Sequence, residues 1–459
     1  MSLWQWRDLL DACGIQNPAE GPNIEGISLD SRTVVAGDLF IALSGDPGPR
    51  FHSSSASDRD GHDFVENAEE NGAAAVMVSR NIATNCSVIE VPNTLNGLWQ
   101  LGEFARKRMR GRVVAITGSA GKTTARQWLE QILGSLGSTH ASTASLNNHW
   151  GVPLSLARMP ASSQYGVFEV GTNRPGEIEP LAELVSPQVS VLLNVLPAHI
   201  GNFDNLDAIR QEKLTIASPL EKGGTLIVPA DLDLSGLKHG NIVTFGLTED
   251  ADVFGKALFL PQYTEVDASV LGTRVSYRLV AGGEHRVLTS LAVLAAAYCL
   301  VDEVDLNKVC DGFSKLTTPK GRGNANTVAG VTVIDDSYNA NPITMAYAIS
   351  AIAKGNPSGK KVALLGEMLE LGDESQLAHA ETSRLAEETL DGFITVGEGF
   401  MSCPGNWGHV GFAAQIDLDE LVRSLKPGDT LLVKGSNKIF WTEKFVDRLL
   451  LSLEAVKQA

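Results

Sequence analysis

Residues 113–124 read VVAITGSAGKTT, and no other stretch says as much about the architecture of the chain. Four apolar, strand-forming residues lead into a turn of small residues, and the helix-like segment ARQWLEQILGSLG follows at 125–137. A buried strand, a glycine-rich turn and a helix make up the context that a phosphate-binding loop requires. The alternative is an ordinary strand-to-helix turn. By itself the stretch indicates only a protein that binds a nucleoside triphosphate.

Small residues in this turn let the backbone wrap closely around phosphates, whose charge the amide groups and the helix N-terminus stabilise. Lys122 is expected to reach the β- and γ-phosphates, and the Thr123 hydroxyl to hold Mg²⁺. The strict pattern is not met, because Ile116 stands where the first glycine belongs. The expected nucleotide-binding residues are Thr117, Gly118, Ser119, Ala120, Gly121, Lys122, Thr123 and Thr124.

Outward from this loop, apolar strand-like runs alternate with amphipathic helical ones, which favours an α/β fold with mostly parallel sheets. We expect three domains. Residues 1–92 form a smaller N-terminal α/β domain, and residues 93–318 form a central domain with a mostly parallel sheet of the P-loop ATPase type. Residues 319–459 form a Rossmann-like C-terminal domain. A polar stretch, 44–61, is expected to be a surface loop.

Composition excludes several classes of function. The 459 residues carry 37 Lys and Arg against 54 Asp and Glu, a net charge of −17, which repels nucleic acid and anionic membranes. The longest apolar run, Leu291–Val301, is too short to span a bilayer. The first residues, MSLWQWRDLLDACG, show no basic stretch followed by a long apolar segment, so we expect no secretory signal, and none of the five cysteines forms a C-x-x-C pair. We therefore expect a soluble, reduced, cytoplasmic protein.

Further motifs occur in a fixed order along the chain. The most discriminating is DDSYNANP at 335–342. The others are DSR at 30–32, GDLFIAL at 37–43, HDF at 62–64, LNN at 146–148, GVP at 151–153, FEVG at 168–171, GEI at 176–178, Asn194 with AH at 198–199, GEMLELG at 366–372 and LVKGS at 432–436. With the TGxxGKTT loop, they resemble the Mur ligases, the amide ligases that build the bacterial wall precursor. The match is best to the branch that adds D-Ala-D-Ala.

The resemblance implies an ATP-driven amide bond between D-Ala-D-Ala and UDP-MurNAc-tripeptide. ATP phosphorylates the tripeptide carboxylate, and the dipeptide amine displaces phosphate from the resulting acyl phosphate. The N-terminal domain would bind the UDP-sugar, the central domain ATP, and the C-terminal domain ATP and the peptide substrate. We expect no nucleic acid partner, no membrane insertion and a monomer. The third residue of the tripeptide is left open.

Two anionic reactants must meet in this reaction, which demands metal ions and a lysine. Glu169 and His199 follow apolar strands, whose C-terminal ends face the ligand crevice in an open parallel sheet. Glu169 suits Mg²⁺, while assigning His199 to a second Mg²⁺ rests on the resemblance. Lys213 matches the lysine that the family carbamylates to make a metal ligand. The alternative for Glu169 is a surface carboxylate at a strand end. For His199 it is a hydrogen-bonded structural imidazole, and for Lys213 a solvated surface lysine.

The resemblance also assigns binding residues elsewhere. In the C-terminal region, Arg322 is expected to contact the ATP phosphates, and Asp336 and Asn339 to lie near the ribose and base. Asp, Ser, Asn and Pro also favour turns, so a simple turn cluster is the alternative. Arg32 can equally form a surface salt bridge. The expected substrate-binding residues are Asp30, Ser31, Arg32, Asn147, Asn148, Lys434 and Ser436.

One departure from the family stands in GEHRVLT, 283–289, where Arg286 and Thr289 replace two asparagines. Thr has a single hydroxyl where Asn pairs in two directions, so adenine recognition is expected to be weaker or differently arranged. Competing functions are the family branch that adds a diamino acid, a folate polyglutamate synthetase, and a non-catalytic nucleotide-binding scaffold. The DDSYNANP segment argues against the first two. The intact residues Lys122, Thr123, Glu169, His199 and Lys213 argue against the third.

Overall fold

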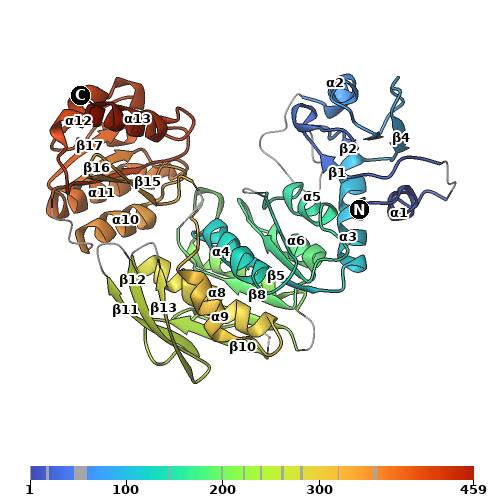
Figure 1. Cartoon of the computed structure of the whole chain (residues 1–459), viewed down its shortest axis with the longest axis horizontal. Coiled ribbons are helices and arrows are strands. Elements are labelled where there is room, and N and C mark those ends of the chain that lie inside the picture. Colours follow the sequence, from blue (N-terminus) through green and yellow to red (C-terminus); the bar gives the residue numbers. More distant parts are fainter. Residues whose placement is uncertain are drawn as a thin grey trace. The chain divides into compact units, whose positions relative to one another are not determined.

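A computed structural model describes residues 2–16, 20–45, 59–143, 146–197, 200–220, 223–237, 240–259, 263–279, 283–318, 320–354 and 359–458. Figure 1 shows their helices and strands. The chain divides into two compact units. Unit 1 comprises Met1–Thr117, Leu133–Val191 and Glu212–Leu226, and unit 2 comprises Gly118–Ile132, Leu192–Gln211 and Ile227–Ala459. The described residues form three β-sheets.

The first sheet belongs to unit 1 and has four parallel strands in the order β1-β2-β3-β4. Its central strands are buried along their length, as expected of strands covered on both faces. The strands are β1 (Gly26–Ser28), β2 (Asp38–Ile41), β3 (Ala75–Val78) and β4 (Ser87–Glu90). The helices of this part are α1 (Trp6–Ala12), η1 (Ser31–Thr33), η2 (Gly61–Phe64), α2 (Val65–Glu70) and α3 (Thr94–Arg108).

The second sheet has nine strands in the order β13-β12-β11-β10-β9-β8-β5-β7-β6. Strands β5, β7 and β6 pair in parallel, while β11, β12 and β13 form an antiparallel meander. The strands are β5 (Arg112–Thr117), β6 (Thr139–Ala141), β7 (Tyr165–Glu169), β8 (Val189–Leu192), β9 (Thr225–Pro229), β10 (Ile242–Gly246), β11 (Val253–Phe259), β12 (Thr264–Val270) and β13 (Thr273–Leu279). The helices are α4 (Lys122–Gly134), α5 (Gly151–Ala157), α6 (Ile178–Val185), η3 (Ile200–Asn202), α7 (Leu206–Leu214), η4 (Thr215–Ala217), α8 (Glu284–Leu300) and α9 (Leu306–Phe313).

The third sheet belongs to unit 2 and has the order β14-β15-β19-β16-β17-β18, parallel except for β14. Its strands are β14 (Asn324–Val328), β15 (Val331–Asp336), β16 (Lys361–Gly366), β17 (Gly392–Val396), β18 (Gly408–Val410) and β19 (Thr430–Lys434). Its helices are α10 (Pro342–Lys354), η5 (Gly372–Glu374), α11 (Ser375–Thr389), η6 (Glu398–Phe400), η7 (Ala413–Gln415), α12 (Leu418–Ser424) and α13 (Phe445–Gln458).

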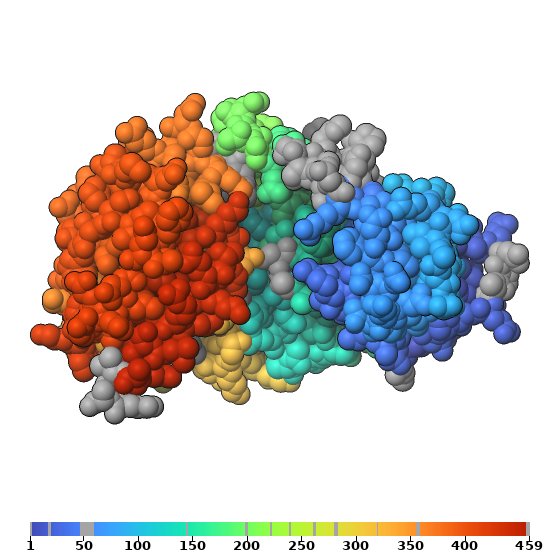
Figure 2. All heavy atoms as spheres, turned by 90° about the horizontal axis from the view of Figure 1, so that it is seen from above, coloured from blue at the N-terminus to red at the C-terminus, as the bar shows by residue number. Residues whose placement is uncertain are grey.

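Alternating strand residues build one core on each face of the third sheet. Val362 and Leu364 of β16 pack with α12 and α13, while Ala363 and Leu365 pack with α10 and α11. This is the two-residue period of a strand that is buried on both faces. In Figure 2 the side chains of this part, orange to red, form a continuous surface on the face in view.

The predicted α/β class with mostly parallel sheets is confirmed. The antiparallel meander of β11, β12 and β13 was not predicted. The expected loop at 44–61 lies mostly outside the described residues, as does position 319, the expected start of the third domain. Among the described residues, no helix combines the length and the apolar character that crossing a membrane requires.

A buried carboxylate anchors the last turn of α7. Glu212 is buried, and its Oε2 accepts a hydrogen bond of 2.7 Å from the Gly176 amide. Its Oε1 accepts bonds of 3.0 and 2.8 Å from the amides of Glu177 and Ile178, at the start of α6. Backbone donors at a helix start are suitable partners for a negative charge. The tie fixes the neighbouring Lys213, which is also buried.

We predict that Glu212→Gln lowers the free energy of unfolding by about 1–3 kcal/mol, because the amide NH₂ must face a backbone N–H donor in the buried site. Chemical denaturation measures this change. Glu183→Gln, on the exposed face of α6, is the matched control and should stay close to the parent chain. Equal stabilities for the two variants would contradict the anchoring role.

A buried histidine holds the segment that follows β16. His379 on α11 is fully buried, and its Nε2 accepts a 3.0 Å bond from the Met368 amide. Its Nδ1 therefore carries the proton and donates to the Ser375 carbonyl at 2.6 Å. Burial lowers the pKa of His379, although the Ser375 carbonyl and the Glu367 charge oppose the shift. Protonation would place a second N–H against the Met368 amide, so the ring is neutral in the folded chain.

A lowered histidine pKa makes folding stability depend on pH. The unfolded chain takes up a proton below about pH 6.5, where the folded chain resists it, so stability is lost as pH falls below that value. Between pH 7.5 and 5.5, His379 is expected to contribute a loss of at most about 1.4 kcal/mol per pH unit. Denaturation at both pH values should show a smaller pH-dependent loss for His379→Gln. Identical losses in the two chains would refute the assignment.

Candidate active site

The turn after β5 is held by a segment that is distant in sequence. Within unit 2, the Ala120 amide donates to Asn194 Oδ1 at 2.9 Å, and Asn194 Nδ2 donates to the Ala120 carbonyl at 3.1 Å. The Ser119 hydroxyl adds 2.9 Å bonds to the Leu196 backbone. Lys122 Nζ donates to the Gly118 carbonyl at 2.7 Å. The motif residue Asn194 therefore holds the backbone of the loop at Ala120 through two hydrogen bonds.

Two glycines are required by this geometry. Gly121 has φ +82°, a region that favours glycine, and a Cβ at Gly118 would stand 3.0 Å from the Leu193 side chain. The last residue of β5, Thr117, has a buried hydroxyl for which no partner is found among the described residues. Thr123 is buried at the start of α4, next to Lys122. The tightly turned backbone, the side chain of Lys122 and the hydroxyl of Thr117 are of the kinds that suit a polyphosphate.

In unit 1, the two asparagines of the LNN motif contact different partners: Asn147 contacts Glu169, and Asn148 contacts the start of α5. Asn147 Nδ2 donates to Glu169 Oε1 at 2.7 Å, and the Asn147 carbonyl accepts from the Gly171 amide. Asn148 Oδ1 accepts from the Gly151 amide at 2.9 Å, at the start of α5. Glu169 is only 1% exposed at the end of β7. The structure thus brings Asn147 and Glu169 together, as neighbours of one potential ligand.

The expected metal ligands are distributed over the chain. Glu169 and Lys213 belong to unit 1, Thr123 belongs to unit 2, and His199 lies outside the described residues. The hydroxyl and carboxylate oxygens of Thr123 and Glu169 are donors of the kind Mg²⁺ prefers. Among the described residues, no cluster of three or more His, Cys, Asp or Glu side chains is positioned for a metal. The convergence of the four ligands stays a prediction.

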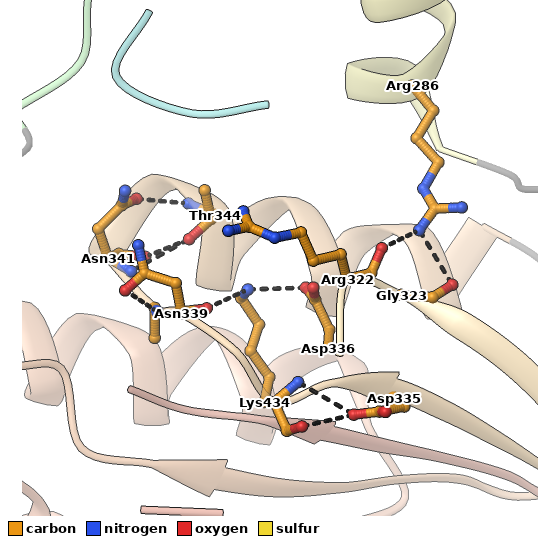
Figure 3. A network of polar contacts seen from close by, with 11 residues as sticks. Arg286, Arg322, Gly323, Asp335, Asp336, Asn339, Asn341, Thr344 and Lys434 are labelled. Carbon is orange, nitrogen blue, oxygen red and sulfur yellow. Dashed lines mark hydrogen bonds and ion pairs between the residues drawn. The ribbon is translucent and has the colours of Figure 1, made fainter. Parts of the chain in front are cut away.

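The DDSYNANP segment follows the end of β15 and forms a connected polar network with its neighbours in unit 2 (Figure 3). Lys434, at the end of β19, is buried and pairs with Asp336 at 2.7 Å. It also donates to the Asn339 carbonyl at 3.1 Å. The Arg322 guanidinium lies 4.3 Å from the centre of the Tyr338 ring. Four residues predicted from sequence therefore meet here: Arg322, Asp336, Asn339 and Lys434.

Asp335 supports this network, although sequence reasoning assigned it no role. It is buried, and its carboxylate accepts bonds from the Gly321 amide at 3.1 Å and from the Ser337 hydroxyl. Burial raises the pKa of Asp335, the bonds from Ser337 and Gly321 oppose this, and the Asp336 charge adds to it. A pair of adjacent carboxylates ending a buried strand was the available signal for such a supporting role.

The remaining expected substrate residues form hydrogen bonds or ion pairs with other residues of the chain. Ser436 is buried, and its hydroxyl accepts from the Leu369 amide at 3.0 Å. Arg32 is 85% exposed and forms a two-point pair with Asp30, at 2.9 and 2.6 Å. The hydrogen bond from Arg32 lowers the pKa of Asp30 despite slight burial of the carboxyl. Ser31 is buried, and its carbonyl accepts from Asn71 Nδ2 at 3.0 Å.

The two residues that depart from the family pattern lie on the first turns of α8. Arg286 is 7% exposed, and its Nη2 donates to the carbonyls of Arg322 at 2.8 Å and Gly323 at 2.9 Å. Burial lowers the pKa of Arg286, which the charge of Asp336 partly offsets. The Thr289 hydroxyl donates to the His285 carbonyl at 2.9 Å, within its own helix. Arg286 therefore serves the backbone of a distant turn.

Comparison with known families agrees with this geometry. Residues 116–297 match the Mur ligase middle domain, and residues 321–437 match the domain described as Mur ligase, glutamate ligase domain. The first range holds the phosphate loop, Glu169 and Lys213. The second holds Arg322, the DDSYNANP segment and Lys434.

Relatives and solved structures match over most of their length. The UDP-N-acetylmuramoyl-tripeptide–D-alanyl-D-alanine ligase of Bacillus subtilis is 31% identical, with 82% of this chain and 80% of the relative covered. The ligase of that name from Treponema pallidum is 32% identical, with 90% and 92% covered. A crystal structure of MurF from Acinetobacter baumannii matches with a TM-score of 0.83 at 32% identity, covering 97% of this chain and 98% of the other. MurF from Thermotoga maritima in complex with ADP matches with a TM-score of 0.77 at 27% identity, covering 95% and 98%. The chain belongs to the Mur ligase family, and within it resembles the members named MurF.

Proposed function

We propose that this chain is an ATP-dependent ligase that joins D-Ala-D-Ala to UDP-MurNAc-tripeptide in the synthesis of the peptidoglycan precursor. The observation that carries the proposal is likeness along nearly the whole chain to proteins whose names state this reaction. A likeness confined to the phosphate loop would have supported only nucleotide binding. The reaction belongs in the cytoplasm, where ATP is available, and the chain acts as a monomer without membrane insertion.

The chemistry proceeds in two balanced steps. A tripeptide carboxylate oxygen bonds to the γ-phosphorus of ATP, the bond to the bridging oxygen breaks, and ADP leaves with its electron pair. The dipeptide amine then attacks the acyl carbonyl, loses a proton and expels inorganic phosphate. Both reactants of the first step are anions, and positioning with charge stabilisation provides most of the catalysis in phosphoryl transfer. In this chain Lys122 and the loop amides provide that charge.

Magnesium ions would be held by Thr123, Glu169, His199 and Lys213, and would neutralise the approaching anions. The oxygen donors fit such an ion, and Asn147 orients Glu169 at 2.7 Å. Lys213 fits only after modification, because a protonated amine cannot bind a cation. Its neutral amine adds to CO₂, a nitrogen–carbon bond forms, and a proton is released, leaving a carbamate with two oxygen donors. Lys213 is buried, so a carbamate there would be kept away from bulk water.

The nucleotide would be bound by residues 117–124 and, from the C-terminal part, by Arg322 at the phosphates and by Asp336 and Asn339 at the ribose and base. Lys434 and Ser436 would serve the peptide side. The residues Asp30, Ser31 and Arg32 would serve the UDP-sugar, and Asn147 and Asn148 would bind substrate from the central domain. These roles fit three domains: 1–92 for the UDP-sugar, 93–318 for ATP, and 319–459 for ATP and peptide.

We predict that phosphate release from ATP requires D-Ala-D-Ala together with UDP-MurNAc-tripeptide, because only the amine carries the acyl phosphate forward. A coupled phosphate assay with and without each substrate measures this. Lys122→Met should abolish release, since it removes the cation at the β- and γ-phosphates. Lys107→Met, on the exposed face of α3, is the matched control and should retain activity. Release at the same rate without the dipeptide would refute the proposal.

A second prediction concerns the carbamate. Lys213→Ala is expected to lose most activity, because a metal ligand is missing, and short carboxylic acids such as acetate should restore part of it by filling the vacated space. Lys256→Ala removes an exposed lysine of β11 and should be unaffected by the same additives. An inactive Lys213→Ala that no carboxylate rescues would leave Lys213 as an ordinary structural lysine.

A further inference from the structure

Arg286 holds a turn that carries a candidate phosphate ligand. One of its two terminal nitrogens, Nη2, donates to the carbonyls of two consecutive residues, Arg322 and Gly323, at 2.8 and 2.9 Å (Figure 3). The side chain starts from the first turn of α8, 36 residues earlier in the chain than Arg322. Such a two-point contact from one buried side chain fixes the orientation of a peptide plane, because neither carbonyl can rotate without losing its donor.

The same turn is held from its opposite edge by Asp335. The Gly321 amide donates to Asp335 Oδ2 at 3.1 Å, and the Gly323 amide donates to the Asp335 carbonyl at 2.5 Å. Gly321 and Gly323 have φ of +75° and +84°, which other residues rarely adopt. The carbonyls of Arg322 and Gly323 and the amides of Gly321 and Gly323 are therefore hydrogen-bonded, and the Arg322 side chain extends from this fixed backbone.

The fit of Arg286 depends on the absence of a neighbouring side chain. A Cβ on residue 323 would stand 2.0 Å from Arg286 Nη2, so the guanidinium occupies the space that any other residue would fill. The Arg322 side chain passes over Tyr338, with its guanidinium 4.3 Å from the ring centre, and extends toward Asn339 and Thr344 (Figure 3). Stacking on an aromatic face limits the directions that a guanidinium can take.

We propose that Arg286 is a positioning residue, which holds the Gly321–Gly323 turn so that Arg322 presents its guanidinium to the nucleotide phosphates. The proposal rests on the function proposed for Arg322 above. Arg286 thus contributes to phosphate binding indirectly, by fixing the backbone from which the Arg322 side chain extends. Both bonds come from Nη2 at the far end of the side chain, and a lysine ends one bond short of that position.

A double-mutant cycle on nucleotide binding tests the proposal. Affinities for ADP are measured by titration calorimetry, and those for adenosine by competition with ADP, for the parent chain, Arg286→Met, Arg322→Met and the double variant. Each single change should weaken ADP binding about tenfold, the usual size of one charged hydrogen-bond contact. The double variant should also stay near tenfold, and adenosine binding should not change. Arg278→Met, an exposed arginine of β13, is the matched control.

Three results would overturn the proposal: a double variant weakened about a hundredfold, unchanged ADP affinity in either single variant, or equal losses for ADP and adenosine. The last would mean that Arg286 only supports the fold or the base. Should Arg286→Met fail to fold, Arg286→Lys enters the same cycle, because it keeps the charge but ends one bond short of the position from which Nη2 reaches both carbonyls. Binding of ADP needs no peptide substrate. A parent chain without dipeptide-dependent phosphate release would therefore refute the ligase function while leaving this cycle decisive.

Discussion

Repulsion between two anions is the constraint on which the architecture depends. A carboxylate and a triphosphate must approach each other in a protein of net charge −17, whose long-range field opposes both. The positive potential has to be local, and the chain concentrates it at the loop after β5. There Lys122 stands at the start of α4, directly after the glycine-containing turn, where a helix N-terminus and a lysine favour a polyphosphate. Net charge and site charge thus have opposite signs, which is possible because screening confines each to its surroundings.

Buried charges elsewhere in the chain hold the elements that carry candidate residues. Glu212 accepts three backbone amides and fixes the turn with Lys213, and Asp335 accepts the Gly321 amide below Arg322. Arg286 does the converse by donating to carbonyls. A buried charge that loses its partner costs several kcal/mol, so each tie is costly to break. Such buried hydrogen bonds hold the neighbouring candidate residues in place, and a single substitution that removes one of them destabilises the fold.

The sequence predicted what is local and missed what is distant. Strand, glycine turn and helix lie within 113–137, so the phosphate loop was visible, and DDSYNANP placed Asp336 and Asn339 at a strand end. The partners of Glu212 lie 34–36 residues away in the chain, and no local sequence pattern predicts them. The antiparallel hairpin of β12 and β13 did leave a signal. In TEVDASV, Val266, Ala268 and Val270 alternate with polar residues, and Gly272 follows at the turn, where Leu271 and Gly272 both have positive φ.

The role that the resemblance assigns to Lys434 differs from the contact that its ammonium makes in the structure. The resemblance assigns it to the peptide side, whereas its ammonium is buried on Asp336, a residue of the nucleotide side. Opening that pair to reach a peptide would leave the partly buried Asp336 without its cation and the buried ammonium without its anion. A substrate that contacts Lys434 must therefore do so while the pair persists. The ammonium has three donors, and Asp336 and the Asn339 carbonyl account for two of them. The third donor would let Lys434 contact a peptide while the pair with Asp336 persists.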